Sequence, residues 1–95
     1  MKKPYLLAFS PMLGTQKEIG DCLNLIPGLT WRYDIPNCFY IVSELSAGEL
    51  ASKVRECKGT DGRFIITEIT TGNKEGWLTP ESWYFMNNLT YQPKD

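Results

Sequence analysis

The stretch PYLLAFSP, residues 4–11, decides the fold. Successive side chains of a strand point to opposite faces, and here both faces are apolar. One face carries Tyr5, Leu7 and Phe9, and the other carries Leu6 and Ala8. A strand that is apolar on both faces is covered on both sides, so we expect residues 3–10 to lie in the middle of a sheet. Pro11 ends this strand, because proline has no N–H to donate to a ladder.

Local signals divide the rest of the chain into short elements. Two capping boxes, in which a hydroxyl and a carboxylate three residues on bind free backbone N–H groups, predict two long helices. These pairs are Thr15 with Glu18, and Ser46 with Glu49. Thr79 followed by Pro80 predicts the start of a short third helix. The predicted elements are a strand at 3–10, a helix at 15–26, strands at 29–35 and 38–42, a helix at 46–57, a strand at 63–70, and a helix at 79–87. Residues 91–95 are predicted to be a loose tail.

This order is typical of an α+β, ferredoxin-like βαββαβ domain spanning residues 1–95. Right-handed crossovers would place both long helices on one face of an antiparallel four-stranded sheet, with the first and third strands in the centre. The other face lacks a long helix, yet its strands are apolar, and an exposed apolar face marks an interface. The predicted interface residues are Leu6, Ala8, Tyr40, Trp77, Trp83 and Phe85. We expect a symmetric homodimer that the segment 77–89 helps to seal; the alternative is a monomer closed by that segment alone.

Charge and composition limit the function. The 95 residues include 10 Lys+Arg and 11 Asp+Glu, a formal net charge of -1, whereas a dedicated nucleic-acid binder is usually basic. A nucleic-acid role would therefore rest on a local patch, for which the candidates are Ser10, Arg32, Lys53 and Arg55. For the two helix residues, a solvated helix face is the simpler reading. Alternation puts Arg32 on the opposite face from Trp31 and Tyr33, which favours core packing for these aromatics.

Histidine is absent from the sequence, which removes the commonest general base and zinc ligand. The three cysteines, Cys22, Cys38 and Cys57, are odd in number and show no CxxC spacing. We therefore expect no zinc, no disulfide and no cofactor, and a reduced, cytoplasmic setting. The first residues resemble a signal peptide only faintly, because no cleavage site follows the short apolar run. No apolar run approaches the roughly 20 residues that span a bilayer, so no membrane association is expected.

Five motifs together resemble a known family. They are PYLLAFS, Trp31, CFYIVSELSAGEL, DGRFIITEIT and GWLTPESWYFMNNL, and they cover nearly the whole chain. The set is similar to the SinR-like small proteins, relatives of the second CRISPR-associated adaptation protein and of VapD-type proteins. The resemblance implies a ferredoxin-like fold and a homodimer. The CRISPR-associated branch includes metal-dependent nucleases with an aspartate at the end of the first strand. Ser10 stands there in this chain, and a hydroxyl does not replace a carboxylate that bridges magnesium.

Few other groups suggest chemistry. Glu44 and Glu68 lie near predicted strand ends, where they are either a carboxylate pair for a metal or solvated surface residues. Ser10 without a histidine base is more simply a hydroxyl that binds local backbone. We therefore expect a homodimeric assembly or regulatory protein without catalytic or metal-binding residues. The alternatives are a metal-dependent nuclease or nucleic-acid-binding protein, and a subunit of a larger protein complex.

Overall fold

A computed structural model describes residues 1–59, 61–70 and 72–89, so the predicted tail at 91–95 lies outside the described residues. The elements follow the predicted order. They are β1 (Lys3–Phe9), α1 (Gln16–Asn24), β2 (Thr30–Arg32), β3 (Cys38–Ser43), α2 (Ala47–Lys58), β4 (Phe64–Glu68) and α3 (Pro80–Asn87). The described residues thus form an α+β domain.

The four strands form one antiparallel sheet in the order β2-β3-β1-β4. The first and third strands are central, as the apolar pattern of β1 predicts. Leu6 marks the register, because it lies opposite Tyr40 on β3 and Thr67 on β4. This open sheet with its three helices is compatible with a ferredoxin-like fold.

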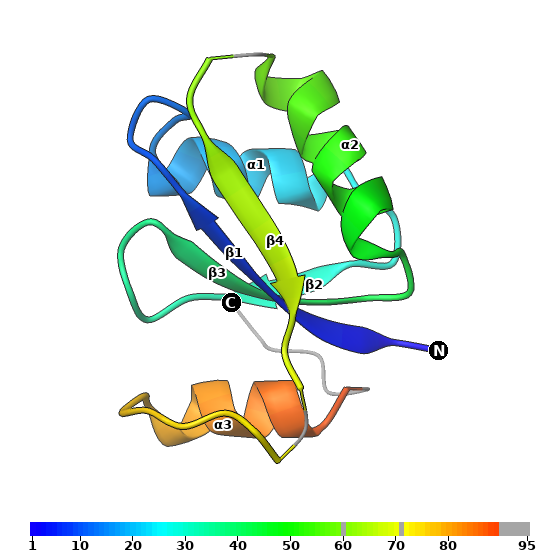
Figure 1. The fold of residues 1–95 in the computed structure, drawn as a ribbon, viewed down its shortest axis with the longest axis vertical. Helices are drawn as coiled ribbons and strands as arrows, with labels where there is room; N and C mark the ends of the chain where they lie inside the picture. Colours follow the sequence, from blue (N-terminus) through cyan, green and yellow to red (C-terminus); the bar gives the residue numbers. More distant parts are fainter. Residues whose placement is uncertain (60, 71, 90–95) are drawn as a thin grey trace.

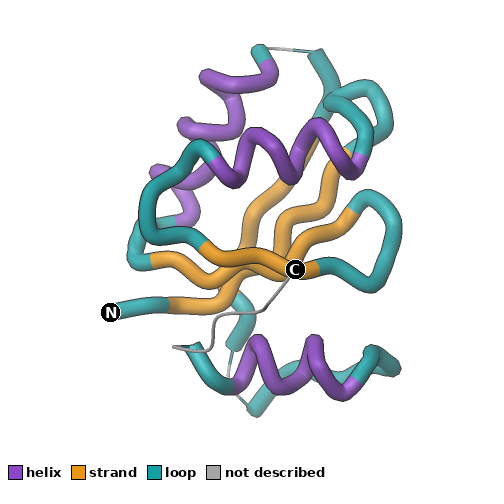
Figure 2. Tube along the Cα trace, turned by 180° about the vertical axis from the view of Figure 1, so that it is seen from behind, coloured by secondary structure: helices purple, strands orange, loops and turns teal. Residues whose placement is uncertain are grey.

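Helices cover both faces of the sheet, but unequally. The helices α1 and α2 lie together on one face, and α3 lies on the other (Figures 1 and 2). The main core is packed beneath α1 and α2 and includes Leu7, Phe9, Ile19, Leu23, Phe39, Ile41, Leu50 and Val54. A smaller cluster lies between α3 and the sheet, and it contains Tyr40 and Val42 of β3 with Phe85 and Met86 of α3. The C-terminal segment therefore covers part of the face for which we expected a cover.

The predicted capping boxes are confirmed. Thr15 Oγ1 accepts the Glu18 N–H, and Glu18 Oε1 accepts the Thr15 N–H at 2.8 Å. Ser46 and Glu49 form the same pair of hydrogen bonds at the start of α2. In each box the backbone N–H of the cap residue binds the carboxylate and lowers the pKa of the glutamate. Thr79 caps α3, with Pro80 at its first position.

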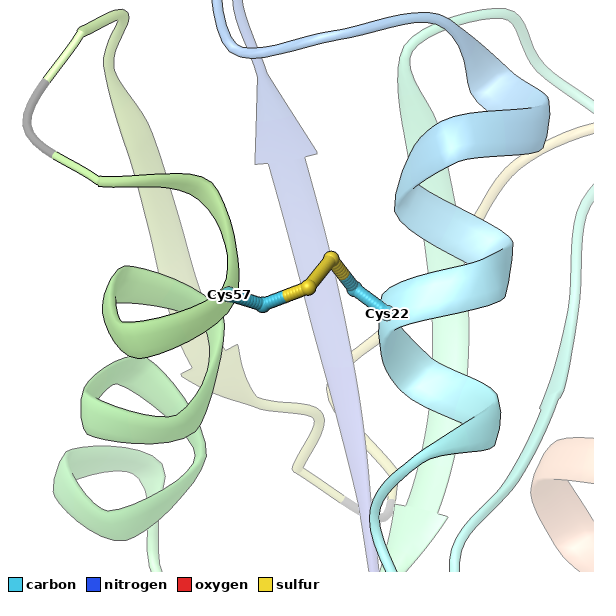
Figure 3. Close-up of a disulfide and its surroundings, with 2 residues drawn as sticks. All are labelled: Cys22 and Cys57. Atoms are coloured by element: carbon cyan, nitrogen blue, oxygen red, sulfur yellow. A yellow bond between two sulfur atoms is a disulfide. The ribbon is translucent and has the colours of Figure 1, made fainter.

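The expectation of no disulfide is wrong. Cys22 of α1 is bonded to Cys57 of α2, with the two Cα atoms 6.1 Å apart, and the bond bridges the helices above the sheet (Figure 3). The two cysteines are separated by 35 positions. The spacing of the two cysteines in the sequence does not predict this bond, because only the side-by-side packing of the helices brings them together. All three cysteines lie in the described residues, and Cys38 is free.

The strands β2 and β4 are shorter than predicted. The strand β2 has three residues, whereas alternation of apolar and polar residues suggested 29–35. After Arg32 the chain turns toward α3, where the Asp34 carboxylate accepts hydrogen bonds from the N–H and hydroxyl of Thr79. Asp34 therefore contacts the cap of a helix 45 positions away instead of continuing the strand, although the alternation of apolar and polar residues continues to Ile35.

Candidate interaction surface

Polar contacts anchor the start of α3 to the sheet. Arg32 Nε donates to Ser82 Oγ at 2.7 Å, and Arg32 Nη2 donates to Thr79 Oγ1 at 3.3 Å. The same guanidinium lies 3.5 Å from the Glu81 carboxylate. Ser82 is fully buried, so its hydroxyl depends on these protein partners. This arrangement fixes α3 over β2 and β3.

The six predicted interface residues fall into three groups. Tyr40 and Phe85 are buried between the sheet and α3. Leu6 and Trp83 are half-buried against the same cluster. Ala8 is half-buried farther along β1, and Trp77 is fully exposed before α3. Burial raises the pKa of Tyr40, whose hydroxyl has no hydrogen-bond partner among the described residues. The buried pair belongs to the fold of one chain and is not available to a second.

The uncovered part of this face is an apolar row across three strands. Ala8 lies opposite Cys38 on β3 and Ile65 on β4. We call these three residues the open row. Ile65 is 63% exposed, while Ala8 and Cys38 are half-buried. A shallow hollow of about 370 Å³ adjoins the row and is lined by Ala8, Phe9, Ser10, Arg63, Phe64 and Ile65. Burial also raises the pKa of the Cys38 thiol, so little of it is thiolate at neutral pH.

The strand β4 is an edge strand next to this row. Within the described residues it pairs only with β1. Arg63 O accepts the Ser10 N–H at 2.8 Å, and Pro4 O accepts the Ile69 N–H at 2.9 Å. Because residues alternate along an antiparallel ladder, these two bonds set its phase. Residues 63, 65, 67 and 69 direct their backbone groups toward β1, and Phe64, Ile66 and Glu68 direct theirs toward the open edge.

The groups that a nuclease would need are not brought together. The Ser10 hydroxyl accepts the Arg63 N–H at 2.9 Å, which is the local backbone role expected for it. Glu44 lies near the other end of β1, 3.3 Å from the N-terminal amine. Glu68 pairs in register with Tyr5 and lies 3.8 Å from Lys3 Nζ. At about 3.3 Å per strand residue, Ser10 is roughly 15 Å from both glutamates or farther.

The basic nucleic-acid candidates also point in different directions. Arg32 is held against α3 on one side of the sheet. Arg55 lies on the other side, 5.0 Å from the centre of the Phe64 ring, and donates to the carbonyl of Gly59. Lys53 is exposed two positions before Arg55, and helix residues two apart do not face each other. These side chains form no continuous basic track.

One hollow was not predicted from the sequence. It measures about 660 Å³ and lies between α1 and β2. Trp31 stacks on Tyr33, with ring centroids 6.2 Å apart, and meets Phe39 edge-on. The Trp31 indole N–H donates to Asn24 Oδ1 at 2.8 Å, and Gly20 provides the space for the ring. Alternation along residues 31–33 places both aromatics on the helix side, but the hollow depends on the distance between α1 and the sheet edge.

The described helices include none with the length and apolar character needed to cross a membrane. No family model, curated protein or solved structure matches the chain.

Proposed function

We propose that the protein is a non-enzymatic homodimeric module with an assembly or regulatory role, and that its second copy binds on the β1–β4 side of the sheet. One observation carries this proposal: α3 covers only part of the apolar face, and the remainder adjoins an open strand edge. The open row and the β4 edge together offer apolar side chains and backbone hydrogen-bonding groups to one partner.

The composition of β4 supports pairing with another strand. An exposed edge is usually protected by lysine, proline, a bulge or a covering loop. The sequence of β4, FIITE, has neither lysine nor proline, and Ile65, Ile66 and Thr67 favour strands. A second copy would cover Ile65 and bind the outward backbone groups. Both effects favour association.

The expectations about fold family, relatives, nuclease activity and cellular location remain proposals. The strand order and the covering helices support the ferredoxin-like assignment, and the resemblance to SinR-like proteins stays a prediction. The nuclease alternative has less support, since Ser10 lies far from Glu44 and Glu68 along β1. A cytoplasmic location also stays a proposal. The Cys22–Cys57 bond weighs against it, because cytosolic reductants keep most thiols reduced.

Light scattering on a dilution series of the intact chain tests the proposal. We expect a mass of twice 10.9 kDa at tens of micromolar. Ile65→Lys should weaken the dimer, because it places a charge at the open row. Ile35→Lys is the matched control, since Ile35 is also exposed but lies beyond β2 at the opposite end of the strand order. A wild-type chain that stays monomeric throughout this range would overturn the proposal.

A further inference from the structure

We infer that two copies join β4 to β4, antiparallel, about a two-fold axis at Ile66, to form one continuous eight-stranded sheet; this inference rests on the proposed homodimer. The partner is a second copy of the chain, and the interface is isologous, meaning that each copy uses the same surface. Backbone phase, charge and side-chain size each support this arrangement.

The backbone phase selects the register. Phe64, Ile66 and Glu68 direct their N–H and C=O groups away from β1, as the Ser10–Arg63 and Pro4–Ile69 bonds establish. With the axis at Ile66, this residue pairs with Ile66 of the second copy, and Phe64 pairs with Glu68 of the second copy. All three outward residues on each chain then exchange hydrogen bonds across the edge. An axis at Phe64 or at Glu68 would carry half of the pairing beyond the end of β4.

Charge complementarity supports the same register. Arg55 lies over Phe64 on the helix side of the sheet. Opposed residues of an antiparallel pair have Cβ atoms about 5 Å apart on one face, so Glu68 of the second copy would lie beside Phe64 and within reach of Arg55. The two-fold axis generates this contact twice. Within one chain, Phe64 and Glu68 are four strand residues apart, roughly 13 Å, so Arg55 meets a Glu68 carboxylate only across the interface.

Side chains on both faces of β4 fit the arrangement. On the α3 side, Ile65 would face Thr67 of the second copy. This contact would cover Ile65, the most exposed residue of the open row. On the helix side, α2 lies along β4 (Figure 1). Gly48 and Ala51 share a helical stripe with Arg55, at spacings of three and four residues. Their small side chains leave room for the two α2 helices to approach each other beside the axis.

Sedimentation velocity on dilution series of charge-reversal variants tests this interface. Arg55→Glu places two carboxylates in contact across each half of the interface, and Glu68→Arg places two guanidinium groups there. Each single variant should weaken dimerisation at least tenfold. The double variant R55E/E68R restores opposite charges and should return to within threefold of wild type. Lys53→Glu and Glu44→Arg are the matched controls, with the same charge changes away from β4, and should leave dimerisation unchanged.

The outcomes separate this inference from the proposed function. A monomeric wild-type chain overturns both. A wild-type dimer that tolerates R55E and E68R overturns the β4 interface and leaves the homodimer in place. Loss of the dimer in both single variants without recovery in the double variant also overturns the inference, because crossed pairing requires recovery. Far-UV circular dichroism shows whether each variant is folded, and Glu68→Arg provides a test that does not disturb Arg55 and its bond to Gly59.

Discussion

Arg32 connects β2 to the start of α3, two segments that are far apart in the sequence. Its side chain leaves β2 on the α3 side and binds Ser82, 50 positions away. The Arg32 side chain is 24% exposed, and its guanidinium lies near the carboxylates of Asp34 and Glu81. The Ser82 hydroxyl is fully buried, and a buried polar group that loses its partner keeps its full desolvation cost. Arg32 is therefore an anchor for α3 and not a free cation for nucleic acid.

Arg32→Ala should destabilise the fold through this anchor. A hydrogen bond to a charged group contributes about 1.5–3 kcal/mol, and we expect a loss of that size in the free energy of unfolding. Urea denaturation followed by tryptophan fluorescence measures it, since Trp83 of α3 packs against the cluster between that helix and the sheet. The control is Arg63→Ala, which removes an exposed arginine outside the α3 contact. Equal midpoints for R32A and wild type would contradict the anchoring role.

Sequence alternation predicted one part of this arrangement and missed the other. It placed Arg32 opposite Trp31 and Tyr33, and the two aromatics stack together on the helix side. The alternation did not reveal that Ser82 and Thr79 receive the guanidinium. Such a partner depends on where α3 packs on the sheet, and no local pattern encodes that position. The hollow beside Trp31 was missed for the same reason.

Among the elements, α1 and α2 are joined by a covalent bond as well as by packing. The Cys22–Cys57 disulfide closes a long loop that contains β2 and β3. Closing a loop removes conformational freedom from the unfolded chain, and the effect grows with loop length. The helix starts, in contrast, depend on residues three positions apart. The capping boxes could therefore be predicted from the sequence, whereas a bond across 35 positions could not.

Cys22→Ser/Cys57→Ser should unfold more easily than wild type. For a loop of this length the chain-entropy relation gives a loss of about 3–4 kcal/mol. Urea denaturation without reductant measures the difference, and a reductant should bring wild type close to the double variant. Cys38→Ser is the control, because that thiol forms no disulfide. A reductant that leaves the wild-type midpoint unchanged would show that the disulfide does not stabilise the fold.

At the scale of the whole molecule, the arrangement of sheet and helices was easier to predict from the sequence than the parts of the sheet that stay exposed. A two-faced apolar β1 indicated a central strand, and the order β2-β3-β1-β4 confirms this position. The same pattern indicated a cover for the second face, and α3 supplies part of it through Phe85 and Met86. The extent of this cover was not predictable from the sequence, because it depends on the position at which α3 packs on the sheet. That position leaves Ile65 and the β4 edge open.

Amide hydrogen exchange at Ile66, followed by NMR over a dilution series, tests the β4 pairing most directly. The Ile66 N–H points to the open edge and exchanges quickly in a monomer, whereas the Ile65 N–H faces β1 and serves as the internal control. We predict that Ile66 is protected at concentrations where the chain is dimeric and loses this protection on dilution or in Glu68→Arg, while Ile65 stays protected. A dimeric chain in which the Ile66 amide exchanges as freely as a solvent-exposed one would contradict the account.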